Sequence, residues 1–170
     1  AYSKKRASEI YFSIPITVSG LTIFVRTDSP VAFDYDDNNA FAGMTFCSAL
    51  GYTFAAGFQP MLDAGKIKLD RISDMKSCFE FIRLKRGDAL VINKHVGWNM
   101  VKSLYKKPPY PVRALKEHEL SVYHLAVTRH HPKALQILSK FNQAIEKMEK
   151  FGVIEQIINR QLAYSDEPAK

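Results

Sequence analysis

The stretch GMTFCSALGYTFAAG, residues 43–57, carries the pattern around which the rest of the chain is organised. Met44 to Leu50 is a short apolar run of strand length, and Gly51 follows it with a backbone that can turn tightly beside a ligand. We expect a helix to begin next, with Thr53 as its capping residue. The first amides of such a helix are unpaired and its dipole favours negative charge, so a small carboxylate or phosphate is the natural guest. A turn without a ligand is the alternative, because every α/β protein has strand-to-helix turns.

The composition limits the broad class of the protein. Of the 170 residues, 46% are hydrophobic and 24% are charged, which is typical of a globular chain. No run of about 18 apolar residues occurs, so we expect no membrane-spanning helix, and no signal peptide is visible after Ala1. The net charge of +7 permits anionic partners, but basic and acidic residues are interspersed and no nucleic-acid-binding motif is present. We therefore expect no nucleic-acid partner.

Strand and helix patterns alternate along the chain. Strands are predicted at residues 21–26, 44–50, 66–72, 88–92, 112–115 and 121–128, and helices at 54–64, 75–85, 94–105, 132–151 and 153–162. This alternation indicates an α/β fold with mostly parallel strands. Crossovers near residues 27–30 and 118–121 would divide the chain into two lobes joined by a hinge. We expect one lobe from residues 1–27 and 120–163, the other from 28–119, and a polar tail at 164–170.

The two cysteines have no spacing that suggests a metal site. Cys47 lies on a predicted strand and Cys78 on a predicted helix, both in apolar surroundings. The favoured interpretation is a pair of buried free thiols. A disulfide between them remains open, because the sequence does not show whether the two side chains meet.

Several segments occur in a fixed order over nearly the whole chain: SKKR at 3–6, FSIP at 12–15, LGYT at 50–53, LKRGDA at 84–89, YHLAV at 123–127, FN at 141–142 and GVI at 152–154. In this order they resemble the type 2 periplasmic solute-binding proteins, in particular the family 3 amino-acid binders of ABC transporters. The resemblance implies two α/β lobes that close on a small ligand. Here it covers a complete second lobe and a partial first lobe, because about 80–100 residues that precede the position of Arg6 in the family, roughly half a domain, have no counterpart.

The resemblance implies a function and a set of site residues. The chain would be a periplasmic, non-enzymatic binding protein without cofactor or metal, which delivers a carboxylate-bearing ligand such as an amino acid to the membrane subunits of a transporter. Arg6 matches the arginine that grips the ligand carboxylate, for which a guanidinium fork is well suited. Gly51, Tyr52 and Thr53 match the turn that binds the same carboxylate from the other lobe. For Arg6 the alternative is one of three neighbouring cations on a solvated strand.

Two departures from the family pattern bear on the ligand and the partners. Asn93 stands where amino-acid binders place an aspartate that faces the ligand ammonium, and an amide does not neutralise a cation. The ligand is then not an ordinary α-amino acid or the pocket has lost such binding, unless Asn93 simply caps the helix that begins at Lys94. The missing half-lobe indicates a fragment, a truncated product, or a chain completed by a complementing chain or by a second copy in a homo-oligomer.

Two other functions remain as alternatives. The same lobes serve as ligand-sensing domains of signalling proteins, and some relatives are dehydratase-like enzymes. An enzyme would need a general acid or base in the cleft. The candidates are histidines at five positions, His95, His118, His124, His130 and His131. Tyr52 and Trp98 could form aromatic walls around a ligand, although core packing explains Trp98 as well.

Overall fold

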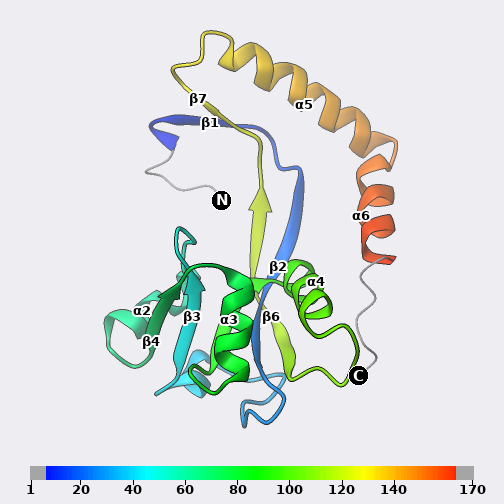
Figure 1. Ribbon diagram of the computed structural model, residues 1–170. Helices are drawn as coiled ribbons and strands as arrows, with labels where there is room; N and C mark the ends of the chain where they lie inside the picture. Colours follow the sequence, from blue (N-terminus) through cyan, green and yellow to red (C-terminus); the bar gives the residue numbers. More distant parts are fainter. Residues whose placement is uncertain (1–6, 164–170) are drawn as a thin grey trace. The chain divides into compact units, whose positions relative to one another are not determined.

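Residues 7–163 are described by the structure, a computed structural model (Figure 1). They divide into unit 1, with residues 7–19 and 120–163, and unit 2, with residues 20–119. The chain passes between the units within β2 (Thr17–Arg26) and again within β6 (Val112–Tyr123). Each unit is a set of residues that contact one another more than they contact the rest of the chain. The lobes expected at 1–27 with 120–163 and at 28–119 stay a prediction.

Unit 2 is built on a five-stranded sheet with the order β4-β3-β5-β2-β6. Strand β3 (Thr45–Ala49) pairs in parallel with both β4 (Lys68–Ile72) and β5 (Ala89–Asn93). Strand β2 pairs with β5 antiparallel. The prediction of an α/β fold is confirmed, but the expectation of mostly parallel strands is wrong at β2. Helical crossovers make neighbouring strands parallel, and such crossovers join only β3, β4 and β5.

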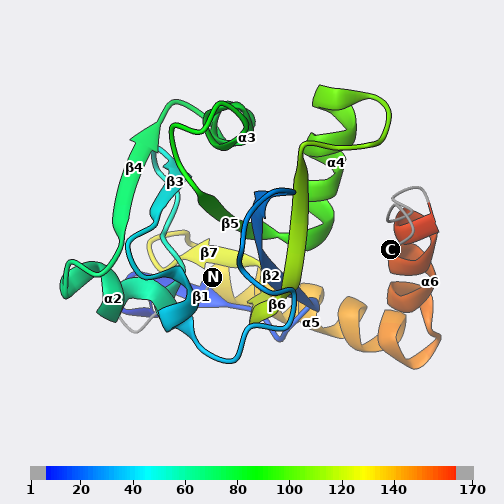
Figure 2. The ribbon, with the colours of Figure 1, turned by 90° about the horizontal axis from the view of Figure 1, so that it is seen from below.

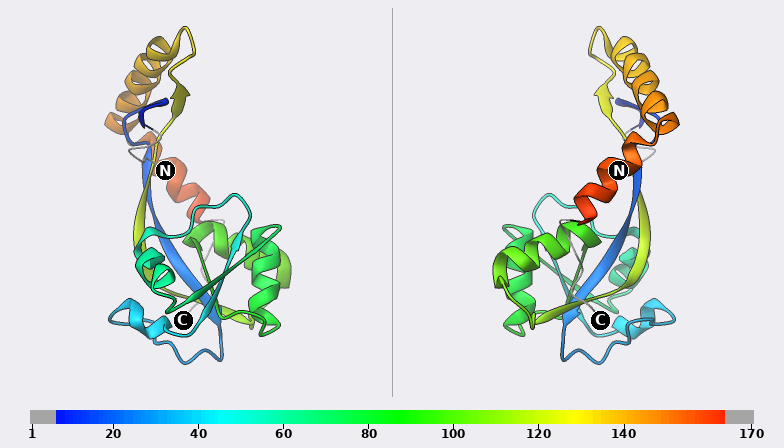
Figure 3. Two further views of the ribbon diagram at one scale, coloured as in Figure 1. Left: turned by 90° about the vertical axis from the view of Figure 1, so that its left-hand side faces the viewer. Right: turned by 90° about the vertical axis from the view of Figure 1, so that its right-hand side faces the viewer.

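The sheet of unit 2 buries a separate core on each face. Alternate residues of a strand point to opposite faces, so Ile23 and Val25 belong to one core and Phe24, between them, to the other. The first core is covered by η1 (Asn38–Phe41), η2 (Ala56–Phe58) and α2 (Gln59–Asp63). The second is covered by α3 (Met75–Arg83) and α4 (Lys94–Tyr105), which lie together on one side of the strands in Figures 2 and 3.

Helix α3 begins where the sequence predicts. The Asp74 carboxylate accepts a hydrogen bond from the Ser77 amide at 2.9 Å and so caps the first turn. Hydrogen bonds from the Ser77 amide and hydroxyl lower the pKa of Asp74, because they stabilise its ionised form. Cys78, Phe79 and Ile82 form an apolar stripe that is buried against the sheet, and the helix predicted at 75–85 is confirmed.

Strand β6 differs from the prediction of two strands at 112–115 and 121–128. It is continuous over Val112–Tyr123, and a separate short strand β7 (Ala126–Thr128) follows. Strand β6 pairs with β2, its neighbour in the sheet. The buried Thr22 hydroxyl of β2 donates to Leu115 O at 2.6 Å and to Lys116 O at 3.2 Å. The crossover expected at residues 118–121 therefore lies inside a strand, because pairing across the sheet overrides the polar local sequence.

The two cysteines form a disulfide, so the favoured interpretation of free thiols is wrong. Cys47 on β3 and Cys78 on α3 are 5.5 Å apart between their Cα atoms, and both side chains are buried. The strand and the helix face each other in the second core of unit 2. The pairing follows from this packing and not from the separation of 31 residues in the sequence.

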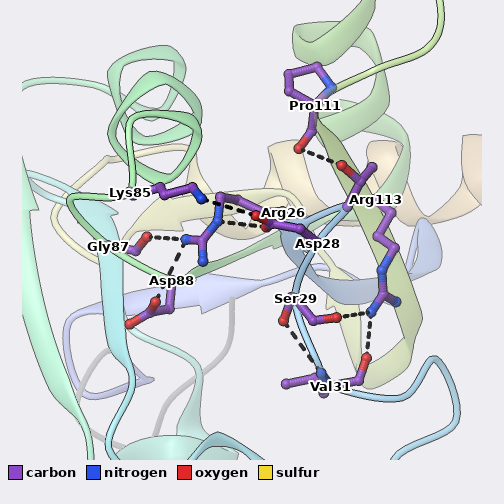
Figure 4. A network of polar contacts seen from close by, with 10 residues as sticks. Arg26, Asp28, Ser29, Val31, Lys85, Gly87, Asp88, Pro111 and Arg113 are labelled. Atoms are coloured by element: carbon purple, nitrogen blue, oxygen red, sulfur yellow. Dashed lines mark hydrogen bonds and ion pairs between the residues drawn. The ribbon is translucent and has the colours of Figure 1, made fainter.

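A polar network stabilises the edge of unit 2 at which β2 ends and β5 begins (Figure 4). Arg26 Nε donates to the Asp28 carboxylate at 2.9 Å, and Arg26 Nη1 donates to Gly87 O at 3.1 Å. The hydrogen bond from Arg26, together with Lys85 Nζ at 3.3 Å, lowers the pKa of Asp28. Gly87 directly precedes Asp88 and the start of β5, so the network lies at the amino end of this strand.

Unit 1 combines a two-stranded antiparallel sheet with two helices. Strand β1 (Ile10–Phe12) pairs with β7, and α5 (Ala134–Lys150) packs on them with Leu138 and Ile145 buried. Helix α6 (Val153–Ala163) follows, so the helices predicted at 132–151 and 153–162 are confirmed. Among the described residues, no helix is both long and apolar enough to cross a membrane.

Candidate ligand-binding site

The candidate site lies at the carboxyl edge of the parallel strands of unit 2. Residues 51–53 follow β3 after Leu50, and Asn93 is the last residue of β5. Because β3 and β5 pair in parallel, with Phe46 opposite Ala89, their carboxyl ends meet at the same edge. Crevices at this edge are the usual ligand sites of open α/β sheets. The structure therefore brings four of the five predicted site residues to one edge of one sheet.

Gly51 gives the turn its shape. Its φ of +80° is a left-handed conformation that residues with a side chain rarely adopt. No atom lies within 4 Å of the position that a Cβ would occupy, so backbone conformation and not crowding requires glycine here. The Tyr52 amide closes the turn by donating to Ala49 O at 3.2 Å. The side chain of Tyr52 is 52% exposed and stands on the surface of the turn.

Thr53 does not cap a helix, so this expectation is wrong. The residue before η2 is Ala55, in an extended conformation and without a side-chain cap, and α2 begins only at Gln59. The helix predicted at 54–64 starts late because Phe54 is buried in the core, where its ring lies 5.6 Å from that of Phe46. Helix α2 has five residues, which is too short for the dipole argument that favoured an anion. Binding at the turn then depends on its amides and neighbouring side chains.

Asn93 caps helix α4. Its Oδ1 accepts hydrogen bonds from the amides of His95, at 3.0 Å, and Val96, at 3.1 Å. The capping role left open by the sequence is therefore confirmed. Charges of both signs lie nearby, because Lys94 follows Asn93 and its Nζ is 3.9 Å from a carboxylate oxygen of Glu117. A methyl group on Gly20 would lie 2.4 Å from that carboxyl group, so Gly20 leaves room for the Glu117 side chain.

Two arginines remain: Arg6, which the sequence predicts as a site residue, and Arg71, which it does not. Arg6 lies outside the described residues, and its expected role stays a prediction. Arg71, which the sequence analysis does not single out, donates through Nη1 to Tyr52 O at 2.7 Å and to Ala49 O at 3.3 Å. In the sequence it resembles any surface cation of an alternating strand. Its contact with the turn arises only from the pairing of β3 with β4.

Of the histidines considered for catalysis, His95 lies at this edge, because its backbone amide donates to Asn93 Oδ1 at 3.0 Å. His118 Nδ1 is 2.9 Å from the Tyr35 hydroxyl, and its ring stacks on Phe58 with centroids 4.6 Å apart. Burial lowers the pKa of His118. His124 Nδ1 contacts Ser13 O at 2.8 Å in unit 1, and His130 and His131 lie next to β7. Among residues 7–163, no group of His, Cys, Asp or Glu side chains has the arrangement of a metal site.

Trp98 belongs to the core and not to a ligand wall. Its ring is 8% exposed and lies 5.4 Å from Phe24 in an edge-on arrangement. A surface hollow of about 490 Å³ in unit 2 is lined by other residues: Pro30, Val31, Ala32, Tyr35, Asp36, Asp37 and Ala40. The candidate residues are not part of it. Gly51, Tyr52 and Thr53 are exposed on the surface of unit 2.

No protein-family model and no curated protein matches the sequence. The structure, by contrast, matches solved proteins over nearly its whole length. It has the mixed α/β fold of the type 2 periplasmic binding proteins and matches about two thirds of their chains.

Three solved structures illustrate this similarity. An ancestral arginine-binding protein bound to arginine is 22% identical with a TM-score of 0.76, and the match covers 94% of this chain and 67% of that one. A structure from work on glutathione import via GshT and the cystine ABC importer TcyBC of Streptococcus mutans is 20% identical, with a TM-score of 0.73 and coverages of 99% and 69%. The GluR0 ligand-binding core in complex with L-glutamate is 13% identical, with a TM-score of 0.72 and coverages of 95% and 69%. Such identities show a common fold.

Proposed function

We propose that this chain is the ligand-binding part of an extracytoplasmic solute-binding protein that captures a small carboxylate-bearing molecule, such as an amino acid, for an ABC transporter. The observation that supports this most is the exposed Gly51–Thr53 turn beside Asn93 at the carboxyl edge of unit 2. Solved proteins of the same fold contain arginine or L-glutamate. Their names are those of binding proteins, and we infer a binding role without catalysis here.

The compartment and the partners follow from two further observations. The buried Cys47–Cys78 disulfide supports an oxidising environment outside the cytoplasm, such as the periplasm. The chain spans about two thirds of the length of the solved proteins that it matches. We infer that the remaining third is supplied by further residues of the same protein, by a complementing chain or by a second copy. The membrane subunits of a transporter would receive the loaded protein.

The ligand class depends on Asn93. Its Oδ1 is occupied by the α4 amides and carries no charge, so it offers little to a ligand ammonium. Our hypothesis is that the ligand is a carboxylate that is not an ordinary α-amino acid, or that amino-acid binding has been lost. The neighbouring Lys94–Glu117 pair brings one charge of each sign and so adds no net charge beside Asn93.

Titration calorimetry tests the proposal. The chain is titrated with a panel of L-amino acids and simple carboxylates, and we expect at least one carboxylate to bind. Tyr52→Ala should weaken that binding tenfold or more, because the ring stands on the turn. Leu84→Ala is the matched control, since Leu84 is 49% exposed elsewhere in unit 2. Absence of binding across the panel would contradict the proposed function, and tight binding of a plain α-amino acid would defeat the Asn93 hypothesis alone.

A ligand-sensing domain of a signalling protein is the second candidate. The match to the GluR0 ligand-binding core favours it, because that protein has the same fold and its name refers to a ligand-binding core and not to a transporter. The two roles share the site and differ in what the full protein contains. The complete reading frame distinguishes them, since a membrane-spanning helix encoded after Lys170 supports a sensor.

A further inference from the structure

Arg71 lies next to the end of β4, beside the strand that leads into the candidate turn. It pairs with Ser48 in the parallel register of β3 and β4, and Ile72 O accepts the Leu50 amide at 2.8 Å. The backbone of β4 is therefore hydrogen-bonded to this chain segment as far as Leu50, directly before Gly51. Beyond that point no ladder hydrogen bond holds residues 51–53, which follow the strand.

The Arg71 side chain continues this support past the end of the strand. Its Nη1 donates to Tyr52 O at 2.7 Å and to Ala49 O at 3.3 Å, which are the carbonyl groups at the two ends of the turn. Ala49 O also accepts the Tyr52 amide at 3.2 Å. One cation thus joins both ends of the segment that contains Gly51, and hydrogen bonds from a charged donor are stronger than neutral ones.

The charge of Arg71 is not neutralised in the part of the chain that the structure describes. The ion pairs within residues 7–163 join other cations to carboxylates, as Arg83 is joined to Glu80 at 2.7 Å. A guanidinium has five N–H donors, and only Nη1 of Arg71 is engaged by the turn. The remaining donors and the full positive charge stand beside exposed residues 51–53.

We propose that Arg71 is the positioning residue of this turn and that it gives the turn its preference for an anionic ligand group. The inference rests on the proposed binding function. It assigns the positive charge of the turn to a residue of β4, so the turn does not need the helix dipole that α2 is too short to supply.

The test compares Arg71→Met, which removes the donors and the charge, with Arg71→Lys, which retains both in a different geometry. Arg83→Met is the control, because Arg83 lies on α3 and its ion pair with Glu80 is away from the turn. Amide hydrogen exchange at Tyr52 is measured in the ligand-free chain. We expect exchange at least tenfold faster in Arg71→Met, an intermediate rate in Arg71→Lys and no change in the control.

The second measurement is binding of L-arginine, L-glutamine and L-glutamate, each compared with its α-amide. Arg71→Met should lose at least tenfold in affinity for the carboxylate form and much less for the amide, while a purely structural role would weaken both equally. Arg71→Lys should recover part of the difference. Unchanged exchange at Tyr52, or equal losses for acid and amide, would overturn the proposal. If the wild-type chain binds no probe, the proposed function fails, and the exchange data alone decide whether Arg71 positions the turn.

Discussion

At the scale of single residues, Asn93 combines an observed capping role with the proposed role in ligand recognition. Its amide oxygen satisfies two of the unpaired amides at the start of α4. The same position lies at the edge where the Gly51 turn is exposed. An aspartate would cap the helix equally well and would add a negative charge. If the proposed site binds a ligand, we expect the choice of an amide to affect the ligand more than the fold.

Substitutions at Asn93 separate these two roles. Asn93→Ala should lower the free energy of unfolding by about 1 kcal/mol, the usual cost of losing a helix cap. Asn93→Asp should leave stability nearly unchanged, because it retains the acceptor, and should raise affinity for ligands that carry an ammonium group. Urea unfolding and calorimetry measure the two effects. Equal stability of Asn93→Ala and the wild type would contradict the capping role.

His118 gives a prediction about pH. Burial lowers its pKa below the ordinary value of 6.5, so the unfolded chain takes up this proton more readily than the folded chain. The stabilisation is therefore fully present above about pH 6.5 and is lost as the pH falls below that value. The carboxylates with lowered pKa, such as Glu80 with an ordinary value of 4.5, add a loss only at lower pH.

Urea unfolding between about pH 5 and pH 8 checks this expectation. The free energy of unfolding should fall as the pH decreases in the wild type, and the dependence should flatten in His118→Gln, which cannot ionise. His130→Gln is the control, because His130 is exposed next to β7. If the free energy of unfolding depends on pH equally in the wild type and in His118→Gln, then His118 does not cause this dependence.

At the scale of elements, the packing of α3 on β3 fixes a large part of the second core of unit 2. Cys47 and Cys78 join the strand before the candidate turn to the helix that covers it. The apolar stripe of α3 was predictable because its spacing is local. The disulfide was not, since it depends on which residues of strand and helix face each other once packed.

Reduction of this disulfide should destabilise the chain. Closing a loop of 31 residues restricts the unfolded chain by an amount equivalent to about 3–4 kcal/mol. Urea midpoints with and without dithiothreitol measure the effect, and Cys47→Ala/Cys78→Ala, which lacks both thiols, serves as the control that should not respond. An identical midpoint for the wild type in both conditions would indicate that the thiols are free.

Element ends were harder to predict than element cores. The strand 44–50 and the helix 94–105 were expected almost as they occur, because apolar spacing and the capping residues are local signals. The helix start near Thr53 was wrong, since burial of Phe54 extends the chain there. The continuous strand β6 was also missed, because its partner β2 lies about 100 residues away in the sequence and supplies the pairing.

At the scale of the whole molecule, unit 1 carries eight of the thirteen large apolar residues that are exposed in the described part of the chain. Its large exposed apolar side chains are Val18, Leu120, Val122, Tyr123, Leu135, Ile137, Phe151 and Ile157. Its sheet has only two strands, and such a pair has unsatisfied edges. Exposed apolar surface of this kind marks a site for further protein.

Light scattering coupled to size exclusion tests this interpretation. We expect the 19.3 kDa chain to associate with itself at high concentration. The pair Leu135→Ser and Phe151→Ser, at residues 65% and 70% exposed in unit 1, should shift it toward the monomer. Leu84→Ser in unit 2 is the control. A well-folded wild-type chain that stays monomeric throughout would count against completion by a second copy.

The sequence by itself determined the alternation of strands and helices and the glycine at the turn, and it offered capping of the helix at Lys94 as one of two interpretations of Asn93, because each depends on neighbours within a few residues. It also pointed to four positions that the structure places on one sheet edge. Only the tertiary structure decided the disulfide, the antiparallel placement of β2 and the reach of Arg71 to the turn. These depend on which strands become neighbours, and that choice minimises the exposed surface of the whole sheet rather than of any local segment.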